Sequence, residues 1–315
     1  MKSSSTILEL PHQQASRLVH TGAPVFLGIN PMEYHGPHLS LANDAVISLG
    51  AAKHLHAVLQ AEAGTEMPFL WAGEVGMGVD PVPGPGSQPC SVATVREATW
   101  RACQGLMALG ARKLVLVTFH GAPLHNTALD QVVRRLERAG VRAYAPATTL
   151  FSLFLDPDLE RFARAYDSVP PDAVGELRER IMQDFHAGFL ETSLALHFAP
   201  ETVCAHELVA PCPRTQPEPG LVRLASLARR VGRKQLAREL IFAAEAAAWY
   251  RLKPFPGYTS RPAMATARAG LVLADLALGD CARVARAVLD GEVGSPRPIM
   301  RWMHHLTLGG RLTLQ

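Results

Sequence analysis

The chain has 315 residues, of which 48% are hydrophobic and 19% charged, so it can bury a sizeable core. Its formal net charge of +3 is small and its arginines are scattered, which argues against nucleic acid as a partner. Its five dispersed cysteines form no Cys-x-x-Cys pair, and there is neither a signal-peptide core nor an apolar run of roughly twenty residues, so we expect a cytoplasmic protein without a membrane partner.

Short apolar runs alternate with helical patterns along the first half of the chain. Strands are expected at residues 25–29, 67–72, 113–119 and 141–145, and helices at residues 45–63, 92–109 and 126–139. This alternation predicts an α/β fold with a mostly parallel sheet, covered by helices on both faces. Further on, we expect one helix that begins near Pro170 and carries His186 to Leu196, and a helical last third over residues 221–250 and 263–289.

The most informative segment follows the first strand and reads Glu33-Tyr34-His35-Gly36-Pro37-His38, with Asp44 at the start of the next helix. Glu33 and His35 are two residues apart, so in an extended segment their side chains leave the same face. Carboxylate and imidazole groups are ligands that suit Zn, Mn or Fe. A polar turn with Asp44 as a helix cap is the alternative. Two carboxylates and two imidazoles at the carboxyl end of a buried strand favour a metal site.

His120 directly follows the clearest buried strand, so we expect it at the same sheet edge as Glu33 and His35. A loop or capping histidine is the alternative interpretation. The Gly- and Pro-rich segment at residues 73–91 matches neither a P-loop nor a dinucleotide-binding fingerprint. We interpret it as a long ordered loop near the site.

Four segments resemble, in order, the motifs of the creatininase family of metal-dependent amidohydrolases. The first runs from Glu33 to Asp44 and resembles Glu-x-His-Gly-x-His-Leu-Pro…Asp. The other three are Thr118-Phe119-His120-Gly121, His186-Ala187-Gly188-Phe189-Leu190-Glu191-Thr192-Ser193 and Pro262-Ala263-Met264-Ala265-Thr266-Ala267-Arg268-Ala269-Gly270. The resemblance implies a creatininase-like three-layer sandwich over residues 1–290, with residues 291–315 as a C-terminal extension. It also implies a homo-oligomer, because family members commonly form hexamers.

By this resemblance the chain would bind two divalent metal ions, Zn, Mn or Fe. One ion would be held by Glu33, Asp44 and His120, and the second by His35, a bridging Asp44 and one more acid. Creatininase supplies that acid two residues after the equivalent of His120, where this chain has Ala122. Glu191 is therefore the candidate fifth ligand, with a helix residue that bonds a neighbouring amide as the alternative.

His186 resembles the family's proton-relay histidine, which would donate to the leaving nitrogen after a metal-bound hydroxide attacks. We count His186 and Glu191 as the catalytic residues. The implied activity is hydrolysis of a cyclic or linear amide-type C–N bond in a small substrate. Creatinine itself is a poor candidate, because the tryptophans that enclose it in creatininase have no match here.

Two other functions remain open at this point. One is peptide processing, as in the creatininase-like peptidase of mycofactocin maturation. The other is a binding or scaffold protein on the same fold that has lost catalysis, an alternative motivated by Ala122 and by Pro123, where the family usually has Asn.

Overall fold

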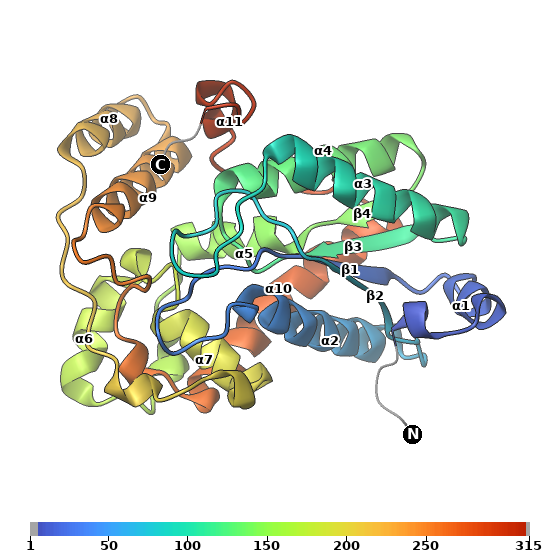
Figure 1. The fold of residues 1–315 in the computed structure, drawn as a ribbon, viewed down its shortest axis with the longest axis horizontal. Coiled ribbons are helices and arrows are strands. Elements are labelled where there is room, and N and C mark those ends of the chain that lie inside the picture. The colour runs from blue at the N-terminus through green and yellow to red at the C-terminus, as the bar shows by residue number, and fades with distance from the viewer. Residues whose placement is uncertain (1–5, 313–315) are drawn as a thin grey trace.

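The computed structural model describes residues 6–312, and at its centre lies a four-stranded parallel sheet of order β2-β1-β3-β4 (Figure 1). The strands are β1 Val25–Ile29, β2 Leu70–Val75, β3 Lys113–Val117 and β4 Arg142–Tyr144. Val25 of β1 pairs with Leu70 on one side and with Leu114 on the other. The parallel sheet predicted from the sequence is confirmed, although β2 spans residues 70–75 rather than 67–72.

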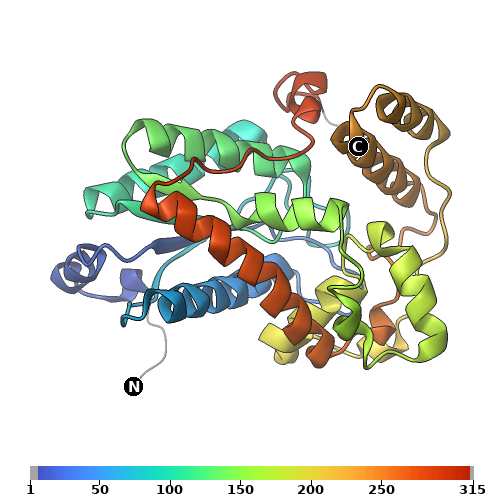
Figure 2. The same ribbon diagram turned by 180° about the vertical axis from the view of Figure 1, so that it is seen from behind.

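Both faces of this sheet are buried, because alternate residues of each strand enter different apolar cores. Leu114 and Leu116 of β3 pack into one core, whereas Val115 and Val117 pack into the other. The helices that cover the first face are α1 His12–Val19, α3 Val92–Ala108 and α4 Pro123–Arg138. Those on the second face are α2 Asn43–Ala63, α5 Pro146–Leu155 and α10 Ala267–Asp290, the long orange-red helix that lies in front in Figure 2. The three-layer architecture expected from the sequence is confirmed.

The single helix expected between Pro170 and Leu196 is wrong. Two helices, α6 Pro171–Glu179 and α7 Phe189–Phe198, are separated by a short 3-10 turn and a loop. Asp184 explains the break, because its Oδ2 accepts the backbone N–H of Leu190 at 3.1 Å and so caps α7. Gly188 permits this approach, since a Cβ there would lie 1.9 Å from Asp184 Oδ1. His186 therefore lies in the loop before α7 rather than on a helix.

The remaining helices lie at one end of the molecule. Helices α8 Pro219–Arg230 and α9 Lys234–Tyr250 form an antiparallel pair, and α11 Trp302–Leu306 lies beside them (Figure 1). Trp302 connects α11 to α9 by donating from Nε1 to Glu239 Oε2 at 2.8 Å. None of the helices within residues 6–312 combines the length and the apolar character needed to cross a lipid bilayer.

Candidate metal centre

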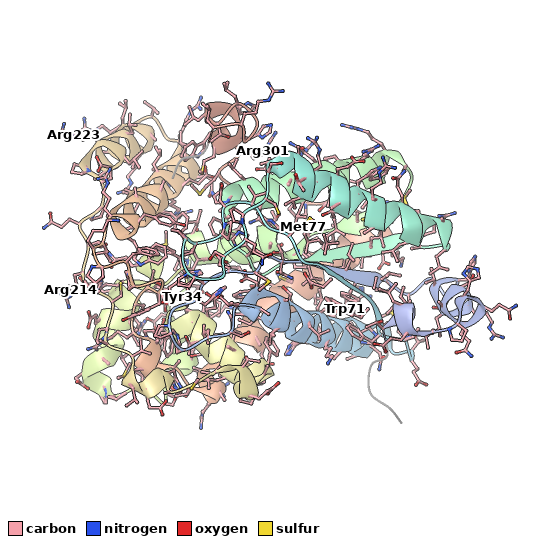
Figure 3. The ribbon with its side chains drawn as sticks, viewed as in Figure 1. Tyr34, Trp71, Met77, Arg214, Arg223 and Arg301 are labelled. Carbon is pink, nitrogen blue, oxygen red and sulfur yellow. The ribbon has the colours of Figure 1, made fainter. Side chains whose placement is uncertain are left out.

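Asn30 joins the carboxyl ends of β1 and β3, where the candidate site is built. Its Oδ1 accepts hydrogen bonds from Thr118 Oγ1 at 3.0 Å and from the Phe119 N–H at 3.1 Å. The same oxygen accepts from Ser48 Oγ of α2 at 3.1 Å. Figure 3 labels Tyr34 and Met77 at this end of the sheet, on the loops that follow β1 and β2. The segment that carries His120 is thereby fixed at the same edge as the segment after β1.

Five buried side chains converge at this edge: Glu33, His35, Asp44, His120 and Glu191. His120 Nδ1 lies 2.9 Å from Glu33 Oε2 and 3.6 Å from Asp44 Oδ2. His35 Nε2 lies 3.5 Å from Asp44 Oδ1 and 3.1 Å from Glu191 Oε1. Asp44 thus lies between the two histidines, with one carboxylate oxygen toward each.

These side chains form overlapping sets whose ligand atoms lie within 4.8 Å of one another. One set consists of Glu33, Asp44 and His120, and a second of His35, Asp44 and Glu191. The first is the set that the family resemblance assigns to one ion. The second joins His35 and Asp44, assigned to the other ion, to Glu191, the candidate for its remaining acid, and Asp44 is common to both sets. A third set joins Glu33 and His35 to His186.

Backbone carbonyl groups orient both histidines of the cluster. His35 Nδ1 donates to the Glu33 carbonyl at 3.0 Å, and His120 Nε2 donates to the Val79 carbonyl at 2.8 Å. The remaining nitrogens, His35 Nε2 and His120 Nδ1, therefore face the carboxylates, and in a neutral ring each would offer its lone pair to a cation held there.

Two buried atoms of the cluster, His35 Nε2 and Asp44 Oδ2, have no hydrogen-bond partner among the described residues. Burying such polar atoms without a partner costs free energy. A divalent cation would satisfy both, and a donor set of carboxylate oxygens and imidazole nitrogens suits Zn, Mn or Fe. The residues present therefore fit a metal.

Burial and mutual charge shift the pKa values of the cluster strongly. Burial, with the nearby charge of Glu33, raises the pKa of Asp44 to about 7. Burial alone would lower the pKa of His120, but Glu33 outweighs it and raises that pKa to about 9. Glu191 and Asp44 likewise overcome burial and hold the pKa of His35 well above its usual value. Without a cation the cluster therefore retains protons, which a divalent ion would displace.

Glu191 reaches the cluster from the first turn of α7. This helix begins at Phe189, between His186 and Glu191, so both side chains can face one cleft. Glu191 Oε2 accepts the Ala187 N–H at 2.6 Å, and Oε1 accepts from Asn43 Nδ2 at 2.7 Å. The amide contact of the alternative interpretation is therefore present, while Oε1 still lies beside His35.

His186 borders the cluster and stacks on it. Its ring centroid lies 4.4 Å from that of His35, and its Nε2 donates to the Tyr34 carbonyl at 2.9 Å. Burial, with the nearby charge of His35, lowers the pKa of His186. The ring is thus neutral near pH 7, and Nδ1 is the nitrogen that remains to accept a proton.

The Gly- and Pro-rich segment between β2 and α3 covers the site. In addition to the Val79 carbonyl that accepts from His120, the Val82 N–H donates to Glu33 Oε1 at 2.5 Å. Ser87 Oγ accepts the Tyr34 N–H at 2.9 Å. The prediction of an ordered loop near the site is confirmed.

The departures at Ala122 and Pro123 lie at the start of α4. Pro123 is the first residue of that helix, a position where the missing N–H has no helical partner to lose. His125 meets the His120 ring edge-on at 5.0 Å, and Asn126 Nδ2 donates to the carbonyls of Ala122 at 3.1 Å and His120 at 3.4 Å. These two side chains support His120 and add no atom to the three donor sets.

Sequence analysis missed three residues that shape the site. Asn43 holds Glu191, as described above, and the Trp249 ring lies 5.7 Å from His186. Asp184 lines a cavity of about 140 Å³ together with Glu33, Asp44 and His120, and burial raises its pKa to about 7. For Asp184 a signal existed, because an aspartate shortly before Gly188 is typical of a helix cap. Trp249 lies far away in the chain and gave none.

Comparisons with known proteins find one matching family and several structures of similar fold. A family model described as Creatininase: Creatinine amidohydrolase matches residues 9–285. A search of curated proteins finds no significant match.

Three similar solved structures illustrate the likeness. One, described as creatininase with Mn, has a TM-score of 0.59 at 18% identity and covers 90% of this chain and 98% of its own. A mutant creatininase of the Zn-Zn type gives 0.56 at 19% identity, with the same coverage. A structure described as a putative creatinine amidohydrolase from Bacteroides fragilis gives 0.58 at 18% identity and covers 92% and 98%. At these identities the likeness establishes the fold.

Proposed function

Because the chain belongs to the creatininase family, we propose that it is a metal-dependent amidohydrolase that binds two divalent ions, Zn, Mn or Fe, and hydrolyses an amide-type C–N bond of a small substrate. The observation that carries this proposal is the pair of donor sets that share Asp44. A carboxylate placed between two histidines suits a bridge between two ions. The unpartnered His35 Nε2 and Asp44 Oδ2 further support it.

Within this proposal each side chain has a definite task. Glu33, Asp44 and His120 hold one ion, and His35, Asp44 and Glu191 hold the other. When bound, such ions polarise a carbonyl group and lower the pKa of water. The Tyr34 and Val79 carbonyls keep His186 and His120 in fixed tautomers and orientations.

Proton transfer in this site is assigned to His186. Its Nε2 is occupied by the Tyr34 carbonyl, so Nδ1 would take up the proton that the attacking water loses and pass it to the leaving nitrogen. A neutral imidazole with a lowered pKa accepts less readily than a free histidine but donates more readily once charged. It is therefore suited to the donation step.

Replacing Asp44 by alanine tests the two-ion proposal. We expect wild-type protein to bind two equivalents of Zn²⁺ or Mn²⁺, as measured by elemental analysis after dialysis. Asp44→Ala removes an oxygen from each donor set, so it should release both metals and abolish activity.

Asp172→Ala, which replaces an exposed aspartate of α6, is the control and should retain both metals. Full occupancy in Asp44→Ala would show that the bridging assignment is wrong. A wild-type protein that takes up no divalent ion would refute the proposed function.

A further inference from the structure

A second cavity adjoins the candidate metal centre. It has a volume of about 150 Å³ and is enclosed mainly by α5, α7 and α10 on the second face of the sheet. Its lining side chains are all apolar except for the hydroxyl of Tyr166. No charged side chain of the described residues lines it.

The two cavities share a wall made of four side chains: Phe119, Leu150, Phe154 and Leu190. Phe119 directly precedes His120, and Leu190 directly precedes Glu191. The segments that supply candidate metal ligands therefore also contribute to the wall of the apolar cavity. A molecule held at the metal centre lies next to it.

We propose that this cavity binds an apolar group of the substrate, about the size of a phenyl ring, which is attached to the amide that is hydrolysed. This inference rests on the proposed function, since it assigns a substrate class to the same site. A charged or hydroxylated group would lose its hydrogen bonds to water there and find almost none in return. An apolar cavity of about 150 Å³ in another protein stays dry and binds benzene, so a cavity of this volume can hold a group the size of a phenyl ring.

The cavity is poorly explained as a packing defect. Space left among leucine and phenylalanine side chains costs stability, and protein cores contain few voids larger than a water molecule. Open apolar space beside a few convergent polar groups is instead typical of ligand pockets. The catalytic chemistry and the selection of the substrate would thus be divided between two adjoining cavities.

Hydroxamates provide the test, because they chelate divalent ions through their two oxygen atoms. Zn²⁺-loaded protein is titrated by calorimetry with acetohydroxamate, phenylacetohydroxamate and 3-phenylpropionohydroxamate. Of the two phenyl compounds, we expect the one that binds more tightly to have an affinity at least about tenfold higher than that of acetohydroxamate. Each buried methylene group raises the affinity roughly fourfold.

Ala277→Phe supplies the matched variant. Ala277 of α10 lines only the apolar cavity, so the larger ring should fill it, remove the tenfold gain and leave acetohydroxamate affinity unchanged. Ala287→Phe, on the same helix at a similarly half-buried position outside this cavity, should keep the gain. A wild-type protein that binds all three compounds equally would overturn the inference, as would a gain that survives in Ala277→Phe.

A measurement without metal separates this inference from the proposed function. Toluene should raise the melting temperature of metal-free wild-type protein, because it binds the folded state only, and should not raise that of Ala277→Phe. If toluene does not raise the melting temperature of the wild type, the apolar site is refuted, whether or not the protein binds metal. If toluene stabilises the protein but acetohydroxamate fails to bind after incubation with Zn²⁺, the proposed function fails and the apolar site stands.

Discussion

Asp44 and Glu191 are both buried carboxylates, yet their hydrogen bonds give them different roles. Asp44 Oδ2 accepts no hydrogen bond from any residue between 6 and 312, so it is available to a cation. Both oxygens of Glu191 already accept hydrogen bonds, from Ala187 and Asn43. Glu191 is therefore held rigidly at the edge of the cluster, where it reaches His35 but not His120.

Because Glu191 enters only one of the two donor sets that contain Asp44, Glu191→Gln should weaken one metal and spare the other. Metal titration by calorimetry would show one site retained and one weakened. Glu201→Gln, at an exposed glutamate, is the control and should bind as the wild type does. Equal loss at both sites, or no loss at all, would leave the fifth ligand unassigned.

His186→Ala addresses the proton transfer separately. Loss of a general acid typically slows turnover by about 10²- to 10⁴-fold. His186 is absent from both donor sets that contain Asp44, so both metals should remain bound. Loss of a metal in His186→Ala would instead indicate that His186 is a ligand, as the third donor set allows.

At the scale of elements, the position of α7 determines the second half of the site, and α10 fixes that position. A Cβ at Gly270 of α10 would lie 1.9 Å from the Ser193 carbonyl oxygen of α7. Ser193 lies two residues after Glu191, on the same helix. The close approach of these helices therefore depends on a glycine.

Gly270→Ala should separate α10 from α7 and lower the free energy of unfolding by about 1–3 kcal/mol. It should also weaken metal binding through the displacement of Glu191. Urea unfolding and metal titration measure the two effects. A Cβ at Gly279 of the same helix would meet no atom within 4 Å outside the backbone of that helix. Gly279→Ala should therefore raise the free energy of unfolding by about 0.5–1 kcal/mol. Equal stabilisation by both variants would contradict the packing argument.

At the scale of the whole molecule, the metal and the fold are thermodynamically linked. In the metal-free protein the pKa of His120 is raised to about 9, and that of His35 also lies above its usual value. Above about pH 7.5 the folded state therefore binds more protons than the unfolded state, in which histidine titrates near 6.5. The free energy of unfolding of the metal-free protein must fall as the pH rises toward 9.

Metal binding requires these same nitrogens to be deprotonated, so a metal-loaded protein escapes this loss. We expect the difference in stability between Zn²⁺-loaded and EDTA-treated protein to widen by on the order of 2 kcal/mol between about pH 7.5 and 9. Thermal or urea unfolding of both forms at several pH values measures it, and added Zn²⁺ should restore the loaded curve. Parallel curves for the two forms would contradict the linkage.

Local patterns in the sequence determined much of this molecule. The apolar runs before Asn30 and Thr118 predicted buried parallel strands, because both faces of such strands are covered and their residues are apolar throughout. Since parallel strands end at one edge, the same runs indicated that Glu33, His35 and His120 would meet. The motif around Glu191 predicted a helix there, but not its start at Phe189, since one helix was expected from near Pro170 to Leu196.

Only the tertiary structure decided which distant residues complete the site. Asp184 interrupts the expected helix through a cap whose geometry depends on Gly188, and Trp249 reaches His186 from another helix altogether. The apolar cavity likewise exists only where α5, α7 and α10 come together. Strand and helix periodicity reports which face of an element is buried, not what packs against it. Contacts between distant segments depend on the packing of the whole chain, and the sequence pattern contains no direct record of them.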